Sequence, residues 1–270
     1  LLFYYSPLCN AAKKCNQEGI NIILSHLGRS IETSYFQKFN FLKEITIPSS
    51  ITRIEDCAFF SCTLLKRINI PLSVTYIGKY AFGRCSNLIE IKIPASVTEM
   101  GKNVFYKCTK LKELILPFSL SKISTCAFEG CTSLDQMIIP SSVTEICSYS
   151  FCSCSNLKKI IIPSSVTFIG EYAFCLCSKL NQIEIPSCVT IISNYLFRGC
   201  TKLNKIIIPP NVTEIGKYAF DNCSSLEEIE IPLSVAKIGE FAFTRCKSLK
   251  KIFIPSPITN IEELDLNPET

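Results

Sequence analysis

The sequence has a single histidine and lacks the short motifs that mark common active sites. His26 is the only imidazole in the 270 residues, so a serine or cysteine nucleophile further along would have no nearby histidine base. A glycine-rich phosphate loop, a His-Glu-x-x-His zinc motif and an EF-hand calcium loop are also missing. We therefore expect a chain that is not an enzyme and that binds no cofactor or metal.

Long apolar runs and clustered basic charge are missing as well. The chain has no run of about 18 apolar residues, so we predict no membrane span within it. Its formal net charge is +5, and its Lys and Arg residues are mixed with Asp and Glu. Nucleic-acid binding usually requires basic residues gathered on one face. We therefore predict no nucleic-acid partner.

What the sequence does have is a repeat of 23 residues. Phenylalanine and cysteine recur with this period, and so does proline at Pro48, Pro71, Pro94, Pro117, Pro140, Pro163, Pro186, Pro209, Pro232 and Pro255. Self-similarity at a period of about 20 to 50 residues is typical of stacked solenoids. We therefore predict a solenoid, and its long surfaces favour binding over catalysis.

Written from its cysteine, each repeat, here called a coil, reads C-x-x-L-x-x-I-x-I-P-x-x-V-x-x-I-G-x-x-A-F-x-x. The I-x-I step alternates like a strand, and the proline ends it because proline has no N–H to donate. We predict a second short strand at V-x-x-I, a tight bend at the glycine, and an irregular or one-turn helical return at A-F-x-x-C. Adjacent coils should pair in parallel to form one long sheet on one face.

The consensus resembles the BspA-like leucine-rich repeats, also called the Treponema pallidum type, over about residues 42–261. The resemblance implies a right-handed solenoid with a parallel sheet along one face. It also implies a cell-surface or secreted protein, with adhesion to a host surface or matrix protein as one role. The chain departs from the pattern where other residues replace the glycine and affect the bend, at Glu55, Ser124, Cys147 and Ser193.

The two ends differ from the regular coils. We predict a helical cap at residues 1–19, with Ser6-Pro7 at its start and Gly19 as its stop. Residues 20–41 keep part of the repeat phase and are predicted to form a degenerate first coil. The regular solenoid covers residues 42–261, and residues 262–270 are predicted to be a truncated coil or tail. Because the chain starts at Leu1 and its last repeat stops partway, we expect a piece of a longer protein.

The 17 cysteines fall into two groups. Nine share one repeat position and are predicted to be buried thiols that act as small apolar side chains. Among the others, Cys152 and Cys175 share a position on adjacent coils, where Cα atoms about 5 Å apart would permit a disulfide. Alternatively, these two could bind zinc together with Cys154 and Cys177. The cysteine pattern does not decide between an oxidising and a reducing compartment, since surface disulfides and reduced cytosolic thiols both fit.

The residues that alternate with the I-x-I isoleucines are predicted to point outward, in a first and a second outward column. The candidate partner-binding residues lie in these columns: Glu113, Ile115, Gln136, Ile138, Lys159, Ile161, Lys205 and Ile207. An apolar strip with a polar border is typical of a protein-binding surface. The alternative is that β-branched residues simply suit the surface of a strand.

A second row of aromatic side chains precedes the Ala-Phe step of the repeat. Its members are Tyr80, Tyr149, Tyr172, Tyr195, Tyr218 and Phe241. We predict half-buried packing on the outer turn for this row, with a ligand surface as the alternative.

Together these features predict a non-catalytic protein-recognition solenoid at the cell surface or secreted, which binds a protein ligand through its sheet face. One alternative is an intracellular, cytoplasmic leucine-rich-repeat scaffold, which the many cysteines favour. Another is the substrate-positioning part of a larger protein. The repeat consensus specifies the framework and leaves the ligand and the oligomeric state open.

Overall fold

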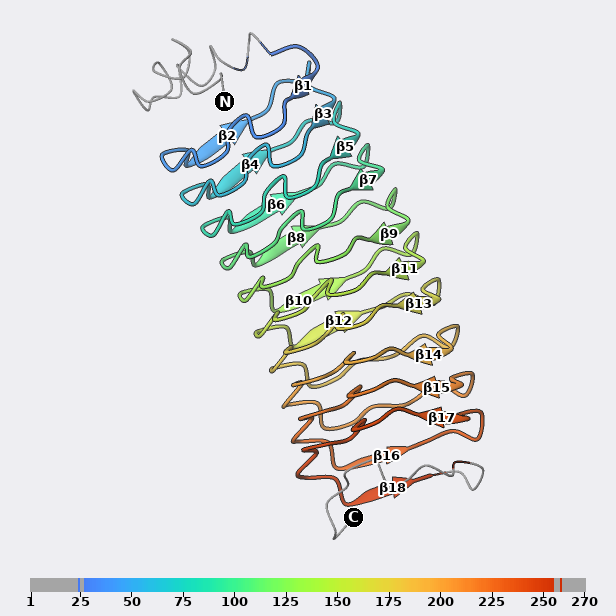
Figure 1. Ribbon diagram of the computed structural model, residues 1–270. Coiled ribbons are helices and arrows are strands. Elements are labelled where there is room, and N and C mark those ends of the chain that lie inside the picture. Colours follow the sequence, from blue (N-terminus) through green and yellow to red (C-terminus); the bar gives the residue numbers. More distant parts are fainter. Residues whose placement is uncertain (1–23, 25–26, 255–257, 259–270) are drawn as a thin grey trace. The chain divides into compact units, whose positions relative to one another are not determined.

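The computed structural model describes residues 24, 27–254 and 258, and the chain forms two units, residues 1–119 and residues 120–270. Each unit is a parallel β-solenoid whose register partners lie 23 residues apart in the sequence (Figure 1). The predicted solenoid is therefore confirmed. The predicted helical cap and the C-terminal tail lie outside the described residues.

In the first unit, two rows of short strands follow the coils. The sheet strands are β2 (Glu44–Thr46), β4 (Arg67–Asn69), β6 (Glu90–Lys92) and β8 (Glu113–Ile115), and they pair in parallel as β2 with β4 and β6 with β8. The second row is β1 (Ser30–Ile31), β3 (Arg53–Ile54), β5 (Tyr76–Ile77) and β7 (Glu99–Met100), which form one four-stranded sheet. Because β1 pairs with β3 in the repeat register, the degenerate first coil stacks on the next coil.

The second unit has the same two rows. Its sheet strands pair as β10 (Gln136–Ile138) with β12 (Lys159–Ile161), and as β16 (Glu228–Glu230) with β18 (Lys251–Phe253). The second row forms two three-stranded sheets, namely β9 (Lys122–Ile123), β11 (Glu145–Ile146) and β13 (Phe168–Ile169), and β14 (Ile191–Ile192), β15 (Glu214–Ile215) and β17 (Lys237–Ile238).

The hydrogen-bonded ladder of the sheet row is shorter than the sequence suggests. Two coils of the second unit carry no sheet strand, although Gln182 bridges to Lys159. Their isoleucines Ile183 and Ile206 are nevertheless buried. The parallel direction predicted for the sheet is therefore confirmed, whereas its strands pair two by two. Side-chain packing continues where the regular strand geometry stops.

A column of phenylalanines, here called the phenylalanine ladder, fills the interior of each unit. Its members are Phe36, Phe59, Phe82, Phe105, Phe128, Phe151, Phe174, Phe197, Phe220 and Phe243, all of them at most 1% exposed. Within each unit, successive rings are nearly parallel, and Phe82 lies 5.6 Å from Phe105 between ring centroids. Each ring therefore packs on a copy of itself, which makes the interior the same from coil to coil.

The repeated cysteines form a second interior column, the cysteine ladder. Its members are Cys62, Cys85, Cys108, Cys131, Cys154, Cys177, Cys200, Cys223 and Cys246, and all are buried. The Sγ of Cys85 donates to the carbonyl oxygen of Phe59 at 3.1 Å, and that of Cys177 to Phe151 at 3.2 Å. Burial raises the pKa of Cys62 and of Cys246 to about 12. The predicted burial is confirmed, and these thiols also join neighbouring coils.

The return of each coil is a series of tight turns without a helix between residues 27 and 254. In one return, Tyr80 and Arg84 adopt left-handed φ angles of 54° and 59° on either side of Phe82. The N–H of Tyr80 and that of Phe82 each donate to a carbonyl of the next coil at 3.0 Å. Left-handed geometry is uncommon for residues other than glycine. Backbone hydrogen bonds between coils compensate for it here.

We predicted that glycine occupies the bend after the second strand because of its conformational freedom, and this reason is wrong. Gly101 does not have a positive φ, but a Cβ added there would lie 2.3 Å from the backbone nitrogen of Lys79. At Gly101, glycine is therefore favoured because the backbone of the neighbouring coil approaches closely. Where serine replaces it, at Ser193, the buried hydroxyl donates to the carbonyl of Ile169. The substitution is therefore accommodated by a hydrogen bond.

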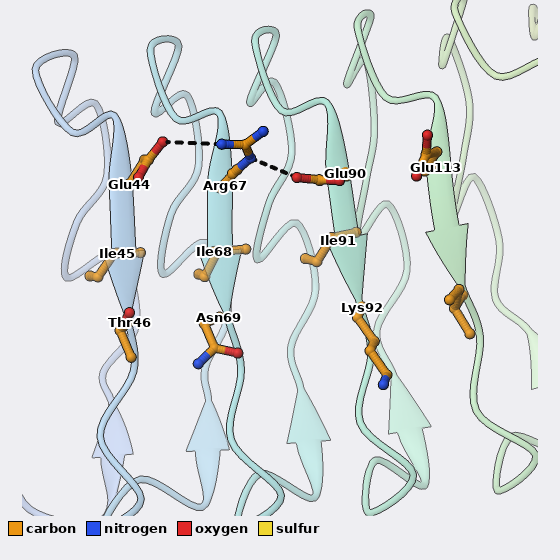
Figure 2. A pocket seen from close by; sticks show the side chains of 11 residues that line it. Glu44, Ile45, Thr46, Arg67, Ile68, Asn69, Glu90, Ile91, Lys92 and Glu113 are labelled. Carbon is orange, nitrogen blue, oxygen red and sulfur yellow. Dashed lines mark hydrogen bonds and ion pairs between the residues drawn. The ribbon is translucent and has the colours of Figure 1, made fainter.

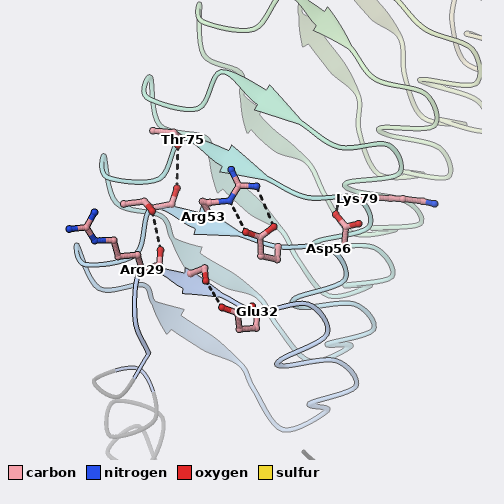
Figure 3. A network of polar contacts seen from close by, with 9 residues as sticks. Arg29, Glu32, Arg53, Asp56, Thr75 and Lys79 are labelled. Carbon is pink, nitrogen blue, oxygen red and sulfur yellow. Dashed lines mark hydrogen bonds and ion pairs between the residues drawn. The ribbon is translucent and has the colours of Figure 1, made fainter. Parts of the chain in front are cut away.

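Polar side chains extend the contacts between coils on the face of the second row. The hydroxyl of Thr52 donates to the carbonyl of Arg29 at 3.1 Å, and that of Thr75 donates to the carbonyl of Thr52 at 3.4 Å. The backbone N–H of Lys79 donates to Asp56 Oδ1 at 2.7 Å (Figure 3). These contacts join one coil to the next, so the polar side chains along the second row stabilise the solenoid.

Candidate functional site: the outward sheet face

All eight predicted partner-binding residues are exposed, which confirms their outward direction. The exposed fraction is 63% for Ile115, 69% for Ile138 and 72% for Ile207. Met137, which stands between two outward residues of β10, is only 4% exposed. The alternation of the strand therefore separates the interior from the surface that we call the sheet face, formed by the two outward columns.

The structure brings some of these residues together. Ile138 and Ile161 are register partners on β10 and β12, and Gln136 is the partner of Lys159 at the start of the same strands. Ile115 belongs to the first unit, where it is the partner of Lys92. We predicted a strip of three adjacent isoleucines. The structure confirms that Ile138 and Ile161 are adjacent, and the adjacency of Ile115 stays a prediction.

The sheet face of the first unit carries a groove of about 470 Å³ across β2, β4, β6 and β8. Arg67 lies between two carboxylates, with its Nε 2.6 Å from Glu90 and its Nη1 3.8 Å from Glu44 (Figure 2). Lys92 and Glu113 also line the groove, with Ile115 at the same strand as Glu113. This groove, the charged groove, presents both signs of charge to a partner.

The sheet face of the second unit carries a groove of about 480 Å³ with a different lining. Ile207 and Phe253 supply exposed apolar surface, Glu228 and Glu230 supply carboxylates, and Lys205 also contributes. We call it the apolar groove. It joins two of the predicted residues to an aromatic ring, a combination that recurs at the centres of protein interfaces.

Sequence reasoning missed two contributors to this region. Phe253 stands in the second outward column and is 62% exposed, so the alternation alone could have selected it. Leu233 follows a repeat proline and is 87% exposed, and it lines a smaller hollow with Phe253. Leu72 and Phe118 hold the same repeat position and are also exposed. The repeat prolines could have identified this exposed position, because it directly follows each of them.

The second aromatic row forms a stack in the second unit. Rings of Tyr149, Tyr172, Tyr195, Tyr218 and Phe241 lie 4.4 to 5.1 Å apart between centroids, and we call this stack the tyrosine ladder. Burial raises the pKa of Tyr172 to about 12, and its two tyrosine neighbours add to the effect. Half-buried packing is therefore confirmed for the four tyrosines of this stack, whereas Phe241 at its end is 38% exposed. Its ring faces contact one another, so they are covered against a flat ligand.

Tyr80, in the first unit, packs differently from the tyrosine ladder. Its ring makes edge contacts with Phe60 at 5.7 Å and Tyr106 at 5.9 Å between centroids. Tyr80 therefore belongs to a local aromatic cluster.

The carboxylate of Asp221 is fully buried. Arg198 donates from Nε to its Oδ2 at 3.1 Å, and Arg245 donates from Nε to its Oδ1 at 2.8 Å. The three residues come from three successive coils. Since both carboxylate oxygens are engaged by guanidinium groups, Asp221 ties coils together, and its geometry does not suit general acid or base chemistry.

The four-thiolate zinc alternative does not fit the geometry. Cys154 and Cys177 direct their Sγ atoms to backbone carbonyls, each at 3.2 Å, and so not into a set with Cys152 and Cys175. Across residues 24, 27–254 and 258, no group of three or more His, Cys, Asp or Glu residues could hold a metal ion. In the same residues we find no helix long and apolar enough to cross a membrane.

The parallel coils, interior ladders and outward sheet face define a leucine-rich-repeat solenoid. The chain belongs to the BspA-type leucine-rich repeat family. The family described as BspA type leucine rich repeat region (6 copies) matches residues 29–158 and 144–264. No curated protein matches the chain.

Several solved structures are similar to this chain. A leucine-rich repeat protein from Bacteroides ovatus is 27% identical, with 89% of this chain and 86% of that chain covered and a TM-score of 0.48. A leucine rich cell surface protein from Faecalibacterium prausnitzii is 28% identical, with coverage of 83% and 82% and a TM-score of 0.45. The T. pallidum leucine-rich repeat protein is 27% identical, with coverage of 77% and 78% and a TM-score of 0.46.

Proposed function

We propose that this chain is a non-catalytic recognition solenoid of a cell-surface or secreted protein, and that it binds a protein partner through its sheet face. The assignment to a protein-binding repeat family supports the general role. The surface location and a role in adhesion to a host matrix protein rest on what the family resemblance implies.

The observation that carries the proposal is the side-by-side exposure of Ile138 and Ile161. Their strands are in register, and the two side chains are 69% and 46% exposed. Gln136 and Lys159 border them on the same pair of strands. An apolar centre with a polar border loses ordered water on contact while its rim keeps hydrogen-bond partners, which favours a protein surface as the ligand.

The two grooves differ in their lining residues, so they would favour different partner surfaces. In the charged groove Arg67 is already paired with Glu90 at 2.6 Å, whereas no ion pair involves Glu113 within the part of the chain that the structure describes. In the apolar groove Phe253 and Ile207 supply surface that an aromatic or aliphatic side chain of a partner could cover. A partner that spans either groove would meet a distinct pattern of charge and apolar area.

The test is solid-phase binding of the purified chain to individually purified extracellular-matrix proteins, each immobilised separately. The double variant Ile138→Lys with Ile161→Lys places two ammonium groups in the apolar centre, so we expect at least about tenfold weaker binding to any matrix protein that the parent binds. Ile191→Lys is the matched control, since Ile191 is 43% exposed on the second row of the same unit. It should bind like the parent.

Equal loss of binding in the control and the double variant would remove the sheet face from consideration. Failure of the parent chain to bind any matrix protein would contradict the adhesion role.

The intracellular scaffold is a second candidate, which the buried cysteine ladder favours. Its thiols act as hydrogen-bond donors in the interior, a role that requires them to stay reduced. A thiol count on the natural protein, denatured without reductant, separates the candidates. A complete set of thiols suits a reducing compartment, and disulfides suit export.

A further inference from the structure

The position directly after the ladder phenylalanine forms a column whose side chains meet between adjacent coils. Arg198 and Asp221 occupy this position on two successive coils, and their side chains contact each other at 3.1 Å. Gly83 and Phe60 occupy it on another two, and a Cβ added at Gly83 would lie 3.0 Å from the Phe60 ring. Side chains in this column therefore point at their counterparts one coil away.

Cys152 and Cys175 occupy this position on two successive coils of the second unit. The turns that carry them are joined by backbone hydrogen bonds, from Phe151 N–H to the Ala173 carbonyl at 2.9 Å and from Ser153 N–H to the Cys175 carbonyl at 2.7 Å. Parallel segments joined in this way lie about 4.8 Å apart. That separation falls within the Cα range of about 4.4 to 6.8 Å that disulfides require.

The environment of these two thiols differs from that of the cysteine ladder on the same coils. Cys154 and Cys177 are 0% exposed and bond to carbonyls, whereas Cys152 is 8% exposed and Cys175 is 3% exposed. A hydrogen bond from the Cys175 thiol lowers the pKa of Cys152, and the same contact together with burial raises the pKa of Cys175. Cys152 is the more exposed of the two thiols and the one whose pKa is lowered, so we assign it the role of the attacking thiol.

We propose that Cys152 and Cys175 form a redox-active dithiol, which closes to a disulfide between two coils when it meets a small organic disulfide. The Cys152 thiolate attacks one sulfur of the oxidant R–S–S–R, which forms a mixed disulfide and releases one thiolate RS⁻. Cys175 then gives its proton to solvent and attacks the Cys152 sulfur. This step expels the second RS⁻, so two protein thiols are oxidised and one R–S–S–R is reduced to two thiols.

The test treats the reduced, folded chain with oxidised glutathione, blocks remaining thiols with an alkylating agent, and maps disulfides by mass spectrometry without reductant. We expect one cross-link, between Cys152 and Cys175, with Cys154 and Cys177 alkylated only after unfolding. Because the cross-link restrains the unfolded chain, the oxidised protein should also melt roughly 5–10 °C higher than the reduced protein, and dithiothreitol should reverse this shift.

Single variants separate the roles of the two thiols. In Cys175→Ser, Cys152 should retain one glutathione as a mixed disulfide, since no second thiol can expel it. In Cys152→Ser, Cys175 should not react in the folded protein. A folded parent chain that stays fully reduced, carries glutathione at Cys152 without the cross-link, or joins another pair of cysteines would overturn the proposal.

Discussion

The interior and the sheet face of this solenoid follow opposite rules. Every described coil places phenylalanine in the phenylalanine ladder, whereas the second outward column of the first unit reads Thr46, Asn69, Lys92 and Ile115. An interior ring packs on its own copy about one coil away, so a change at one coil leaves a mismatch with both neighbours. An outward side chain faces water and can change alone. Stability thus depends on the interior, and the sheet face is the surface for which we propose recognition.

The two sheet-face grooves show how much the outward residues can differ from one coil to another. On the same backbone pattern, the charged groove holds Arg67 between Glu44 and Glu90, while the apolar groove exposes Ile207 and Phe253. The interior residues of the same strands, such as Ile68 and Ile229, are buried in both. Two surfaces with different chemistry can therefore share one framework.

The largest effect should come from the interior. Phe174→Ala removes a fully buried ring from the phenylalanine ladder, so we expect the free energy of unfolding to fall by about 3–5 kcal/mol. Phe253→Ala is the matched control: its ring is 62% exposed, and the loss should stay below about 0.5 kcal/mol. Urea denaturation measures both. Similar losses for the two variants would erase the distinction between interior and sheet face.

A smaller effect is expected for the buried carboxylate that joins three coils. Asp221→Ala removes charge-assisted hydrogen bonds to Arg198 and Arg245, and should lower the free energy of unfolding by about 1–3 kcal/mol. The cost is limited because both guanidinium groups remain about half exposed. Arg67→Ala on the sheet face also breaks ion pairs, but exposed ones, and should cost less than about 1 kcal/mol. Thermal denaturation ranks the two variants, and the reverse order would be evidence against Asp221 as a stabilising link between the coils.

The cysteine ladder should make the fold sensitive to alkaline pH. The folded pKa of Cys62 and of Cys246 is about 12, against 9.0 for an unperturbed thiol. Between these values the folded chain keeps protons that the unfolded chain releases, so the stability present at neutral pH falls as pH rises from about 9 toward 12. Tyr172 adds to the fall above about pH 10.

Thermal melts of the reduced protein at intervals from about pH 7 to about pH 11 measure this decline. A melting temperature that stays level across this interval would mean that the ladder thiols ionise freely in the folded protein.

The sequence was sufficient to predict the framework and the direction of the outward residues. Strand alternation depends only on a period of two, so Met137 and Ile138 could be assigned to opposite faces from their order. The repeat position of Cys62 likewise indicated burial. These predictions required only the stacking of equal coils.

Other features depend on distances that a repeat consensus does not contain. The closeness of Gly101 to the Lys79 backbone, at 2.3 Å from an added Cβ, follows from how tightly neighbouring coils approach. The left-handed φ of Tyr80 could not be read from a residue type that usually avoids it. The joining of Arg198, Asp221 and Arg245 needs three coils in register, although their spacing of about one repeat was visible in the sequence.

The most direct test of the division between framework and recognition surface is the urea-unfolding free energy of the Ile138→Lys, Ile161→Lys double variant, measured beside its parent. We expect the two free energies to agree within about 1 kcal/mol, because both side chains already face water. A loss above about 3 kcal/mol would show that these isoleucines are part of the packed interior, and would contradict the account.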